Sequence, residues 1–469
     1  MSIMPDAPPS FIQALPAPCE NVIETHISWV LLTREHAYKI KKPVTLPFLD
    51  YGTVEKRRHY CNEELRLNRR FAPELYLDVV ELAGEPAVKM RRFPEAQRLD
   101  HVSSQGDLSG AQLTQLARDL AAFQGEAARA TPGYGTPETI RGDALENFDE
   151  LERLLPVEVP LLTRLRTWTE AEWRRREPDF ARRHAAGCVR EGHGDLHLGN
   201  LVLLDDRVVP FDGIEFNENF RCIDVANEIA FTLLDLLDHG RPGLATWLLD
   251  AWLEWSGDHD ALSVLRFYLV YRAMVRAKIA ALRHAGGRAA ADAQEAAGYL
   301  ALAARLTLPP APTLTITCGP SGSGKTHAGS RRLASAEFLH TVRIRSDVER
   351  KRLYGLAPDA ASGGAIYAPA ATLRTYARLA ELAEQALKAG WSVIVDAAFL
   401  KRAEREAFRT LAARLQVPFA ILAPPATPDE MACRLATRRG DASEATVAVL
   451  EQQLRWMEPL GADEPATPR

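Results

Sequence analysis

A glycine-rich segment that follows an apolar run constrains the fold of this chain more than any other feature of its sequence. The run Leu314-Thr-Ile-Thr-Cys leads into a match to G-x-x-x-x-G-K-T, made of Gly319, Pro320, Ser321, Gly322, Ser323, Gly324, Lys325 and Thr326. In such a segment, backbone N–H groups wrap phosphates at a helix N-terminus, the lysine meets the β and γ phosphates, and the threonine holds Mg2+. The sequence therefore predicts a strand, a phosphate-binding loop and a helix, and we call Gly319–Thr326 the P-loop.

A second buried strand is predicted after the P-loop, and it ends in a carboxylate. The run Trp391-Ser-Val-Ile-Val leads directly into Asp396. An aspartate at the end of such a strand supports the magnesium ion of a bound nucleotide. Together with the P-loop, this strand predicts a P-loop NTPase fold in which helices flank a parallel sheet.

The segment from His193 to Asp212 carries another set of groups suited to phosphoryl transfer. The run His193-Gly-Asp195-Leu-His-Leu-Gly-Asn200 is followed by an apolar strand and then by Phe-Asp212-Gly. Transfer to a hydroxyl needs one carboxylate that takes the proton, and a carboxamide and a second carboxylate that hold Mg2+. The spacing predicts Asp195 as the base, and Asn200 and Asp212 as metal ligands.

Residues 27–41 predict a β-hairpin that places a lysine where a kinase needs one. Lys39 lies on the second strand with apolar residues on both sides, and the corresponding strand lysine of a kinase pairs the α and β phosphates. The nearby Lys41 and Lys42 leave the register of this strand open, and a surface lysine is the alternative interpretation of Lys39.

The helix predicted over residues 53–70 supports the kinase interpretation of Lys39. Thr53 is placed to cap its N-terminus, and the helix carries Glu63 and Glu64. A kinase uses a helix glutamate to hold its strand lysine. We expect Glu64 to be that partner, while Glu63 stays open as the alternative.

The His-Gly-Asp form of the catalytic loop, in place of His-Arg-Asp, resembles the aminoglycoside phosphotransferase and choline kinase branch of the protein-kinase-like fold. This resemblance implies a bilobal fold for the N-terminal part, with the hinge after the strand predicted at 87–94. The kinase-type glycine-rich loop is missing, so the resemblance implies that residues 24–28 cover the phosphates, with Ser28 among the ATP contacts. It also implies that Asp224 braces the catalytic loop.

The residues between the two C-terminal strands resemble a different group of kinases. A short strand predicted at 342–345 runs into Asp347, and Arg350 follows three residues later. This arrangement is similar to nucleotide and polynucleotide kinases, including zeta-toxin-like members and related AAA family ATPases. The resemblance implies that Asp347 is the base, that Arg350 orients the substrate, and that Arg434 and Arg438 belong to a lid over ATP. For each arginine, a solvated helix face is the alternative.

A proline cluster at 309–312 predicts the domain boundary. We expect a kinase-like domain over 1–308, a linker over 309–312 and a P-loop domain over 313–469. This combination of two domains resembles a bacterial family of fused predicted kinases. The predicted fold class is α/β and α+β in two domains. Helical periodicity is found over 108–127, 145–176 and 242–306.

Length and composition agree with a two-domain enzyme. A chain of 469 residues exceeds one ordinary core, and its 25% charged and 46% hydrophobic content is typical of globular proteins. From Thr313 onward, 21 Lys and Arg residues face 17 Asp and Glu residues, a net of +4 that is too weak to demand a polynucleotide. The six cysteines form no C-x-x-C pair, and no membrane-spanning apolar run is found, so we expect a cytoplasmic protein.

These features predict an ATP- and Mg2+-dependent phosphotransferase with two kinase-like modules. The acceptors are expected to be hydroxyl groups of small molecules of the sugar, nucleoside or sugar-nucleotide type. The alternative is a polynucleotide 5′-hydroxyl kinase in the C-terminal module, with a regulatory N-terminal pseudokinase. Nucleic acid is thus a possible but less favoured partner, a membrane is not expected, and the oligomeric state stays open.

Overall fold

The computed structural model describes residues 9–286, 290–437, 442–464 and 466–467, and the chain divides into two compact units. The first unit contains Met1–Gln112, Glu126–Ile140 and Phe180–Asp235, and the second contains Leu113–Gly125, Arg141–Asp179 and Leu236–Arg469. The second unit joins helices that precede the proline cluster to the P-loop part that follows it. The domain boundary at 309–312 therefore stays a prediction.

An antiparallel sheet of five strands forms the beginning of the first unit, in the order β1-β2-β3-β7-β6. Its strands are β1 (Asn21–Glu24), β2 (Ser28–Leu32), β3 (His36–Lys41), β6 (Tyr76–Leu82) and β7 (Glu85–Arg91). β2 and β3 form the hairpin predicted from residues 27–41, and its turn closes through hydrogen bonds between Thr33 and His36.

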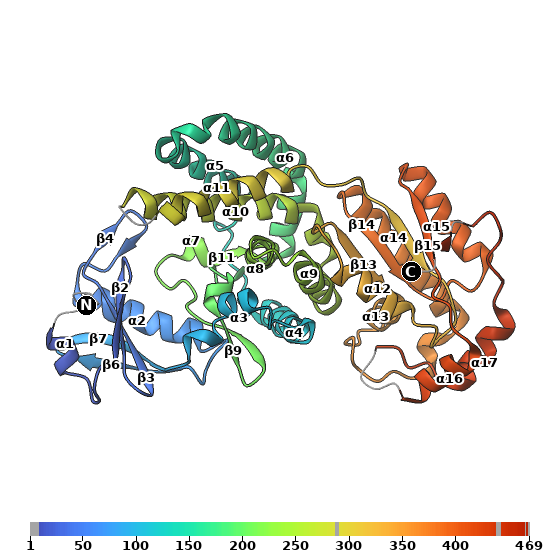
Figure 1. The fold of residues 1–469 in the computed structure, drawn as a ribbon, viewed down its shortest axis with the longest axis horizontal. Helices are drawn as coiled ribbons and strands as arrows, with labels where there is room; N and C mark the ends of the chain where they lie inside the picture. Colours follow the sequence, from blue (N-terminus) through green and yellow to red (C-terminus); the bar gives the residue numbers. More distant parts are fainter. Residues whose placement is uncertain (1–8, 287–289, 438–441, 465, 468–469) are drawn as a thin grey trace. The chain divides into compact units, whose positions relative to one another are not determined.

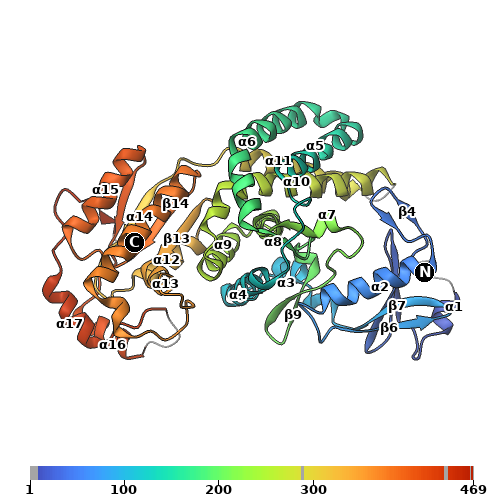
Figure 2. The same cartoon turned by 180° about the vertical axis from the view of Figure 1, so that it is seen from behind.

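Helix α2 (Val54–Asn68) packs against β6 and β7 of this sheet (Figures 1 and 2). The Thr53 hydroxyl accepts a hydrogen bond from the Lys56 N–H, at 3.3 Å, so Thr53 is the predicted N-cap. The buried residues of the helix include three polar ones: Arg57, which binds Glu85 of β7, and Glu64 and Asn68. A helix that buries polar side chains in this way needs partners for them, which the site provides.

The remainder of the first unit holds the predicted catalytic loop between two small antiparallel pairs. β8 (Val189–Glu191) pairs with β11 (Cys222–Asp224), and β9 (Leu201–Leu204) pairs with β10 (Arg207–Pro210). The turn between β9 and β10 places Asp205 and Asp206 at φ of 48° and 63°, as a two-residue hairpin turn requires. Helix α8 (Val225–Asp238) follows and is almost entirely buried.

The helices of the second unit confirm most of the predicted helical periodicity. α4 (Gly110–Glu126) covers the predicted range 108–127, and α9 (Pro242–Ser256), α10 (Leu262–Ala285) and α11 (Ala290–Leu306) cover 242–306. The helical periodicity predicted over 145–176 is divided between two helices, because α5 (Pro137–Leu154) ends before Pro156 and α6 (Val159–Ala186) starts after it. Proline lacks the N–H donor of a helix interior and disfavours helical backbone in the residue before it.

A parallel sheet of five strands forms the P-loop part of the second unit, in the order β13-β14-β12-β15-β16. Its strands are β12 (Leu314–Thr317), β13 (Thr341–Arg345), β14 (Ser392–Asp396), β15 (Phe419–Leu422) and β16 (Ala466–Thr467). Every residue of β12 and β14 is buried, as expected for central parallel strands that are covered on both faces. β13 is an edge strand.

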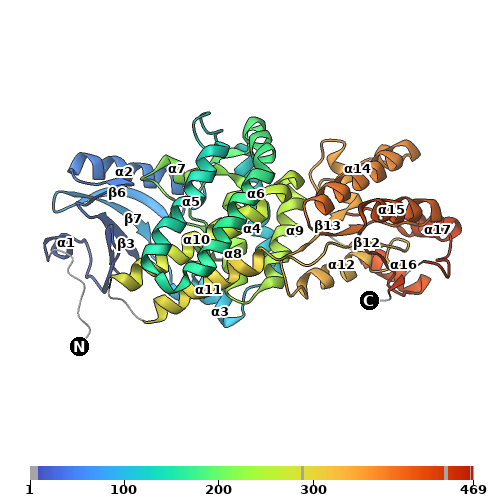
Figure 3. The same ribbon diagram turned by 90° about the horizontal axis from the view of Figure 1, so that it is seen from above.

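Helices lie on both sides of this sheet, with α12 (Lys325–Ala334) and α14 (Pro369–Lys388) on opposite faces (Figure 3). The helices of this part are α12 (Lys325–Ala334), α13 (Ser346–Arg352), α14 (Pro369–Lys388), α15 (Arg402–Leu415), α16 (Pro428–Thr437) and α17 (Val447–Trp456). This architecture confirms the predicted fold class. Short elements elsewhere are α1 (Pro9–Gln13), β4 (Thr45–Leu46), β5 (Leu49–Asp50), η1 (Glu95–Gln97), α3 (Leu99–Gln105), η2 (Pro156–Glu158), η3 (Leu198–Asn200), α7 (Glu218–Arg221), η4 (His259–Ala261) and η5 (Gly364–Tyr367).

Helices that are long and apolar enough to cross a membrane are not found among the residues that the structure describes.

Candidate active sites

Lys39 of β3 joins two carboxylates that are far apart in the sequence. Its Nζ lies 2.9 Å from Glu64 Oε1 of α2 and 2.5 Å from Asp212 Oδ1. Glu63 does not face this lysine and instead lies 2.8 Å from the Arg66 guanidinium on its own helix. Of the two glutamates that the sequence left open, the one that contacts Lys39 is therefore Glu64.

A second lysine, Lys41, contacts the same glutamate from the buried side, and the sequence analysis missed this role. Its Nζ lies 2.7 Å from Glu64 Oε2, 3.3 Å from the Tyr51 hydroxyl, and in hydrogen-bond contact with Glu215 Oε1. Side chains two residues apart on a strand share one face, so the pattern Lys39-Ile-Lys41 already placed both ammonium groups toward α2. We call Lys41, Tyr51, Glu64 and Glu215 the buried network.

The charge of Glu64 depends on these two lysines. Burial alone would raise the pKa of the Glu64 carboxyl, but the ammonium groups of Lys39 and Lys41 outweigh burial and lower that pKa to about 2. Burial acts to lower the pKa of Lys39, and the charges of Asp212 and Glu64 overcome it and raise that pKa well above its ordinary value. Both groups are therefore held in their charged forms.

This shift predicts a pH dependence of stability that the Glu64→Gln variant removes. Because the folded pKa lies below the unfolded value of about 4.3, the ionised carboxylate stabilises the fold above that value. The stabilisation is lost as the pH falls toward 2. We expect the difference in unfolding free energy between wild type and Glu64→Gln to be largest near pH 7 and to shrink steadily below pH 4.3. Urea denaturation at a series of pH values measures it, and a constant difference contradicts the assignment.

The loop that carries Asp195 is held by hydrogen bonds from Asn200 and by a contact with His197. Asn200 Nδ2 donates to the backbone carbonyl and to Oδ2 of Asp195, each at 3.0 Å. His197 Nε2 lies 3.4 Å from Asp195 Oδ2, and its ring packs against Phe231. His197 therefore combines packing against α8 with a contact to the candidate base.

Helix α8 supplies side chains that hydrogen-bond to the backbone of this loop. Asp235 Oδ2 accepts from the Leu198 N–H at 3.0 Å, and the Thr232 hydroxyl donates to the Leu196 carbonyl at 2.6 Å. Asp224, the residue expected to brace the loop, instead binds Arg183 through two hydrogen bonds of 2.8 Å. Its Oδ1 also accepts from the Ala226 N–H in the first turn of α8. Asp224 therefore orients the helix that supports the loop.

Asp212 has a left-handed backbone that its neighbours hold in place. Its φ is 62°, a conformation that non-glycine residues adopt rarely and that is frequent at functional sites. Its N–H donates to the Tyr76 hydroxyl at 2.9 Å, and the Gly213 N–H donates to Asn68 Oδ1 at 2.8 Å. β6 and α2 thus aim the Asp212 carboxylate at Lys39.

Ser28 lies at the start of β2, where its hydroxyl is buried. This hydroxyl lies 2.8 Å from the Thr25 hydroxyl, and the Ser28 N–H donates to the same Thr25 oxygen at 2.9 Å. The side chain of Thr25 therefore closes the turn of residues 24–28. A contact of Ser28 with ATP stays a prediction.

The P-loop connects β12 to α12 as the sequence predicted, and Lys325 is the first residue of the helix. Lys325 Nζ donates to the Pro320 carbonyl at 2.7 Å and lies 3.4 Å from the Ser323 hydroxyl. Gly322 has a φ of 82°, and a Cβ on it would lie 2.6 Å from the Met431 carbonyl of α16. Only glycine therefore fits this turn of the P-loop.

The helices α16 and α17 hold the outer side of the P-loop. Arg434 Nη1 donates to the Gly322 carbonyl at 3.2 Å, and Gln453 Oε1 accepts from the Ser321 N–H at 2.6 Å. Gln453 was not predicted, because nothing in the sequence of α17 marks it. Arg438, the second predicted lid arginine, lies outside the described residues.

The remaining predicted residues of this site gather at the ends of β13 and β14. Asp396 ends β14, and Asp347 lies in the first turn of α13, directly after β13. Arg350 is buried and donates to the Ile366 carbonyl at 2.9 Å and to the Thr372 hydroxyl at 3.2 Å. Arg350 therefore holds the segment around η5 in this structure, and its role toward a substrate stays a prediction.

Asp396 offers an oxygen suited to a magnesium ion. Its Oδ2 is buried and has no hydrogen-bond partner among the residues that the structure describes. Mg2+ is usually bound by one or two carboxylates together with substrate phosphates. The position of Asp396, one strand away from the P-loop, fits that pattern.

Comparisons with known proteins give one family model and several proteins to which parts of this chain are similar. Residues 314–460 match the family model of an AAA domain. Among solved structures, the GDP complex of aminoglycoside 2′-phosphotransferase-IIIa is 15% identical with a TM-score of 0.42, covering 64% of this chain and 96% of that one. A gluconokinase from Sinorhizobium meliloti 1021 is 20% identical with a TM-score of 0.25, covering 33% of this chain and 81% of that one.

The similarity to one curated relative extends over almost the whole length of both chains. The protein Rv2004c of Mycobacterium tuberculosis is 30% identical over 455 residues, which are 94% of this chain and 91% of the relative. The chain therefore belongs to the same protein family as Rv2004c, and its residues 314–460 match an AAA domain.

Proposed function

We propose that this chain is an ATP- and Mg2+-dependent phosphotransferase with two kinase-like modules, each transferring the γ-phosphate of ATP to a hydroxyl group of a small molecule. The observation that carries the proposal is the position of Lys39. It contacts Glu64 and Asp212, which lie 25 and 173 residues away in the sequence. A strand lysine, a helix glutamate and a metal-binding aspartate are the groups that a kinase site brings together.

In the N-terminal module, Asp195 is the base that takes the proton of the acceptor hydroxyl, and Lys39 positions the phosphates. Glu64 keeps Lys39 in place through its ion pair. Asn200 and Asp212 are the residues that hold Mg2+, and Ser28 contacts ATP from the turn of residues 24–28. Positioning and charge neutralisation carry most of the barrier reduction in phosphoryl transfer.

In the C-terminal module, the P-loop binds the triphosphate and Asp347 is the base. Thr326 and Asp396 hold Mg2+, which when bound neutralises the charge that develops on the phosphates. Arg434 and Arg438 close over the nucleotide, and Arg350 orients the acceptor. This module is supported by the strand, loop and helix around Lys325 and by the AAA domain match.

The acceptors are proposed to be sugars, nucleosides or sugar nucleotides, and the cytoplasm, where ATP is abundant, is the proposed compartment. The weak net charge of +4 from Thr313 onward argues against a polynucleotide, because phosphate backbones are bound through many cations.

Labelled-phosphate transfer tests the proposal with one variant for each proposed base. Wild type, Asp195→Asn and Asp347→Asn are incubated with γ-labelled ATP, Mg2+ and pooled sugars, nucleosides, aminoglycosides and 5′-hydroxyl oligonucleotides. We expect each variant to lose transfer to a different acceptor by about 10²-fold to 10⁴-fold, the usual contribution of a general base. Equal transfer by all three proteins contradicts both assignments. Salt-sensitive transfer to oligonucleotides would replace the small-molecule proposal for the C-terminal module.

A further inference from the structure

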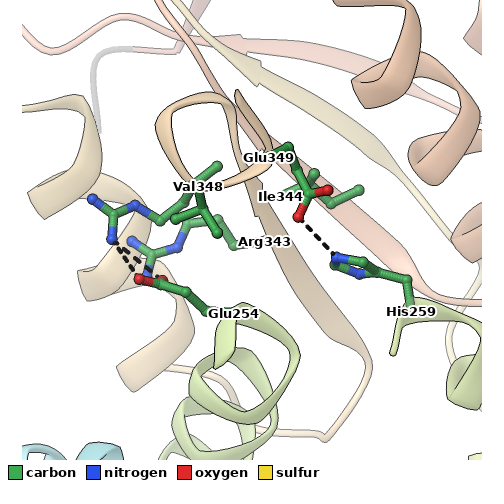
Figure 4. Close-up of a pocket in the computed structure, with 7 residues that line it drawn as sticks. Glu254, His259, Arg343, Ile344, Val348 and Glu349 are labelled. Carbon is green, nitrogen blue, oxygen red and sulfur yellow. Dashed lines mark hydrogen bonds and ion pairs between the residues drawn. The ribbon is translucent and has the colours of Figure 1, made fainter. Parts of the chain in front are cut away.

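Helix α9 carries two carboxylates that bind two arginines of the edge strand β13. Asp250 and Glu254 are one helical turn apart, and Arg343 and Arg345 are two residues apart on one strand face. Arg343 Nη2 lies 2.7 Å from Asp250 Oδ2, and Arg345 Nη1 lies 3.0 and 3.2 Å from the two oxygens of Glu254. Figure 4 shows Glu254 reaching from its helix toward the arginines. The spacing of the two carboxylates on α9 thus matches the spacing of the two arginines on β13.

Arg343 also contacts α12, the helix that starts with the P-loop lysine, and so links Asp250 to that helix. Its Nη1 donates to the Thr326 carbonyl at 3.3 Å and to the Ser330 hydroxyl at 2.9 Å, both on α12. Arg343 and Asp250 are both buried, with exposed fractions of 7% and 5%, so this ion pair is shielded from solvent. The position of the first turn of α12 therefore depends on a carboxylate of α9.

Arg345 lies between Glu254 and the proposed magnesium carboxylate. It is the register partner of Asp396 across β13 and β14, and its Nε lies 3.9 Å from Asp396 Oδ2. Two opposite charges at this distance attract each other strongly in a partly buried site. Glu254 competes for the same guanidinium at a shorter distance, which leaves Asp396 Oδ2 without a hydrogen bond among the described residues.

The fit between α9 and the P-loop part is close around these ion pairs. His259 Nε2 lies 3.4 Å from Glu349 Oε1 of α13, as Figure 4 also shows. A Cβ on Gly257, which follows α9, would lie 2.3 Å from the Arg352 guanidinium, and a Cβ on Gly243 would lie 2.0 Å from the Ala334 carbonyl of α12. α9 therefore lies directly against β13 and α12 and covers an edge strand that would otherwise be open.

We infer that Asp250 and Glu254 are positioning residues of the P-loop site, although they lie before the proline cluster. Asp250 fixes the first turn of α12 through Arg343, and Glu254 holds Arg345 beyond hydrogen-bond distance of Asp396 Oδ2, so that this oxygen stays available to Mg2+. The inference rests on the proposed function of the P-loop as a site for Mg2+ and ATP. It adds that this site is completed by a helix from the kinase-like part of the chain.

The test uses the full chain and a readout that is local to the P-loop. Hydrogen exchange of peptides that cover residues 319–334 is measured with AMP-PNP, a non-hydrolysable ATP analogue, while the Mg2+ concentration is varied. In Glu254→Gln, Arg345 turns to Asp396, and we expect the Mg2+ concentration for half-maximal protection to rise about tenfold, the effect of losing one charge-assisted hydrogen bond. In Asp250→Asn, we expect the concentration of AMP-PNP for half-maximal protection to rise by a similar factor.

Glu295→Gln is the matched control, because Glu295 of α11 forms ion pairs with Arg276 and Arg283 of α10, outside the P-loop part. We expect it to behave as wild type. A Glu254→Gln protein whose Mg2+ requirement lies within twofold of this control overturns the inference, even if its melting temperature falls, because a lower melting temperature alone shows only a structural role.

A different result would contradict the proposed function itself: a wild-type chain whose residues 319–334 show no protection from hydrogen exchange at any concentration of Mg2+ and AMP-PNP. If Glu254→Gln does not fold, Glu254→Asp replaces it, since aspartate keeps the charge but shortens the side chain. We expect an Mg2+ requirement between those of wild type and the tenfold shift. An unchanged requirement in Glu254→Asp, with Asp250→Asn also equal to the control, overturns the inference.

Discussion

Replacing Lys325 with alanine is expected to abolish ATP turnover by the C-terminal module. Lys325 begins α12, and its ammonium group lies inside the P-loop against the Pro320 carbonyl and the Ser323 hydroxyl. A lysine at this position meets the β and γ phosphates. Removing one preorganised cationic or hydrogen-bonding group from a transferring phosphoryl group typically lowers turnover by about 10²-fold to 10³-fold.

The measurement is ATP turnover in an Asp195→Asn background, which removes the proposed base of the other module. Lys388→Ala is the control, because Lys388 is an exposed lysine in the same unit that pairs with Glu384 at 2.8 Å. An exposed pair of this kind contributes less than about 1 kcal/mol, so turnover and stability are expected to stay near wild type. Full turnover by Lys325→Ala would contradict the assignment of the P-loop as the ATP site.

The parts of both sites that follow local sequence patterns were predictable. The P-loop between β12 and α12, the hairpin of β2 and β3, and the Thr53 cap of α2 each depend on residues that are close in sequence. The end of α5 also follows a local signal, since Pro156 comes two residues after Leu154. Local sequence patterns were therefore sufficient to predict these helices and strands and most of the candidate site residues.

The contacts that orient those residues were not predictable in the same way. Glu215 and Lys41 are 174 residues apart, and Arg343 and Asp250 are 93 residues apart. A charged residue on a helix or strand is usually solvated, so each of these appears ordinary in sequence. Only the packing of separate elements removes them from water and makes an opposite charge necessary. The support of both sites therefore depends on pairs that a single sequence does not reveal.

The buried network provides the second large effect, in the Lys41→Met variant. Lys41 is 1% exposed and contacts Glu64, Glu215 and Tyr51, and Glu64 itself is fully buried. Methionine keeps most of the volume but leaves Glu215 without its cation and Glu64 with only Lys39. Removing one partner of a buried ion pair typically destabilises a protein by about 3–5 kcal/mol. We expect a loss of that size in the unfolding free energy of the first unit.

Two neighbouring lysines on the same chain segment separate stability from catalysis. Lys39→Met removes the ion pairs of Lys39 with Glu64 and with the partly exposed Asp212 but leaves Glu64 paired with Lys41, so we expect phosphate transfer to be lost with a smaller loss of stability. Lys42 pairs with Glu24, whose side chain is 37% exposed, so Lys42→Met is expected to change stability by less than about 1 kcal/mol.

The measurement is urea denaturation monitored by hydrogen exchange of peptides from β3 and α2, which reports on this unit alone. A readout from one unit is needed because a chain with two units need not unfold in one step. The expected order of unfolding free energy is Lys42→Met above Lys39→Met, and Lys39→Met above Lys41→Met. A Lys41→Met protein as stable as Lys42→Met would show that the network adds no net stability. In that case Lys39 alone would stabilise the negative charge of Glu64, and Lys41 would not help to position Glu64.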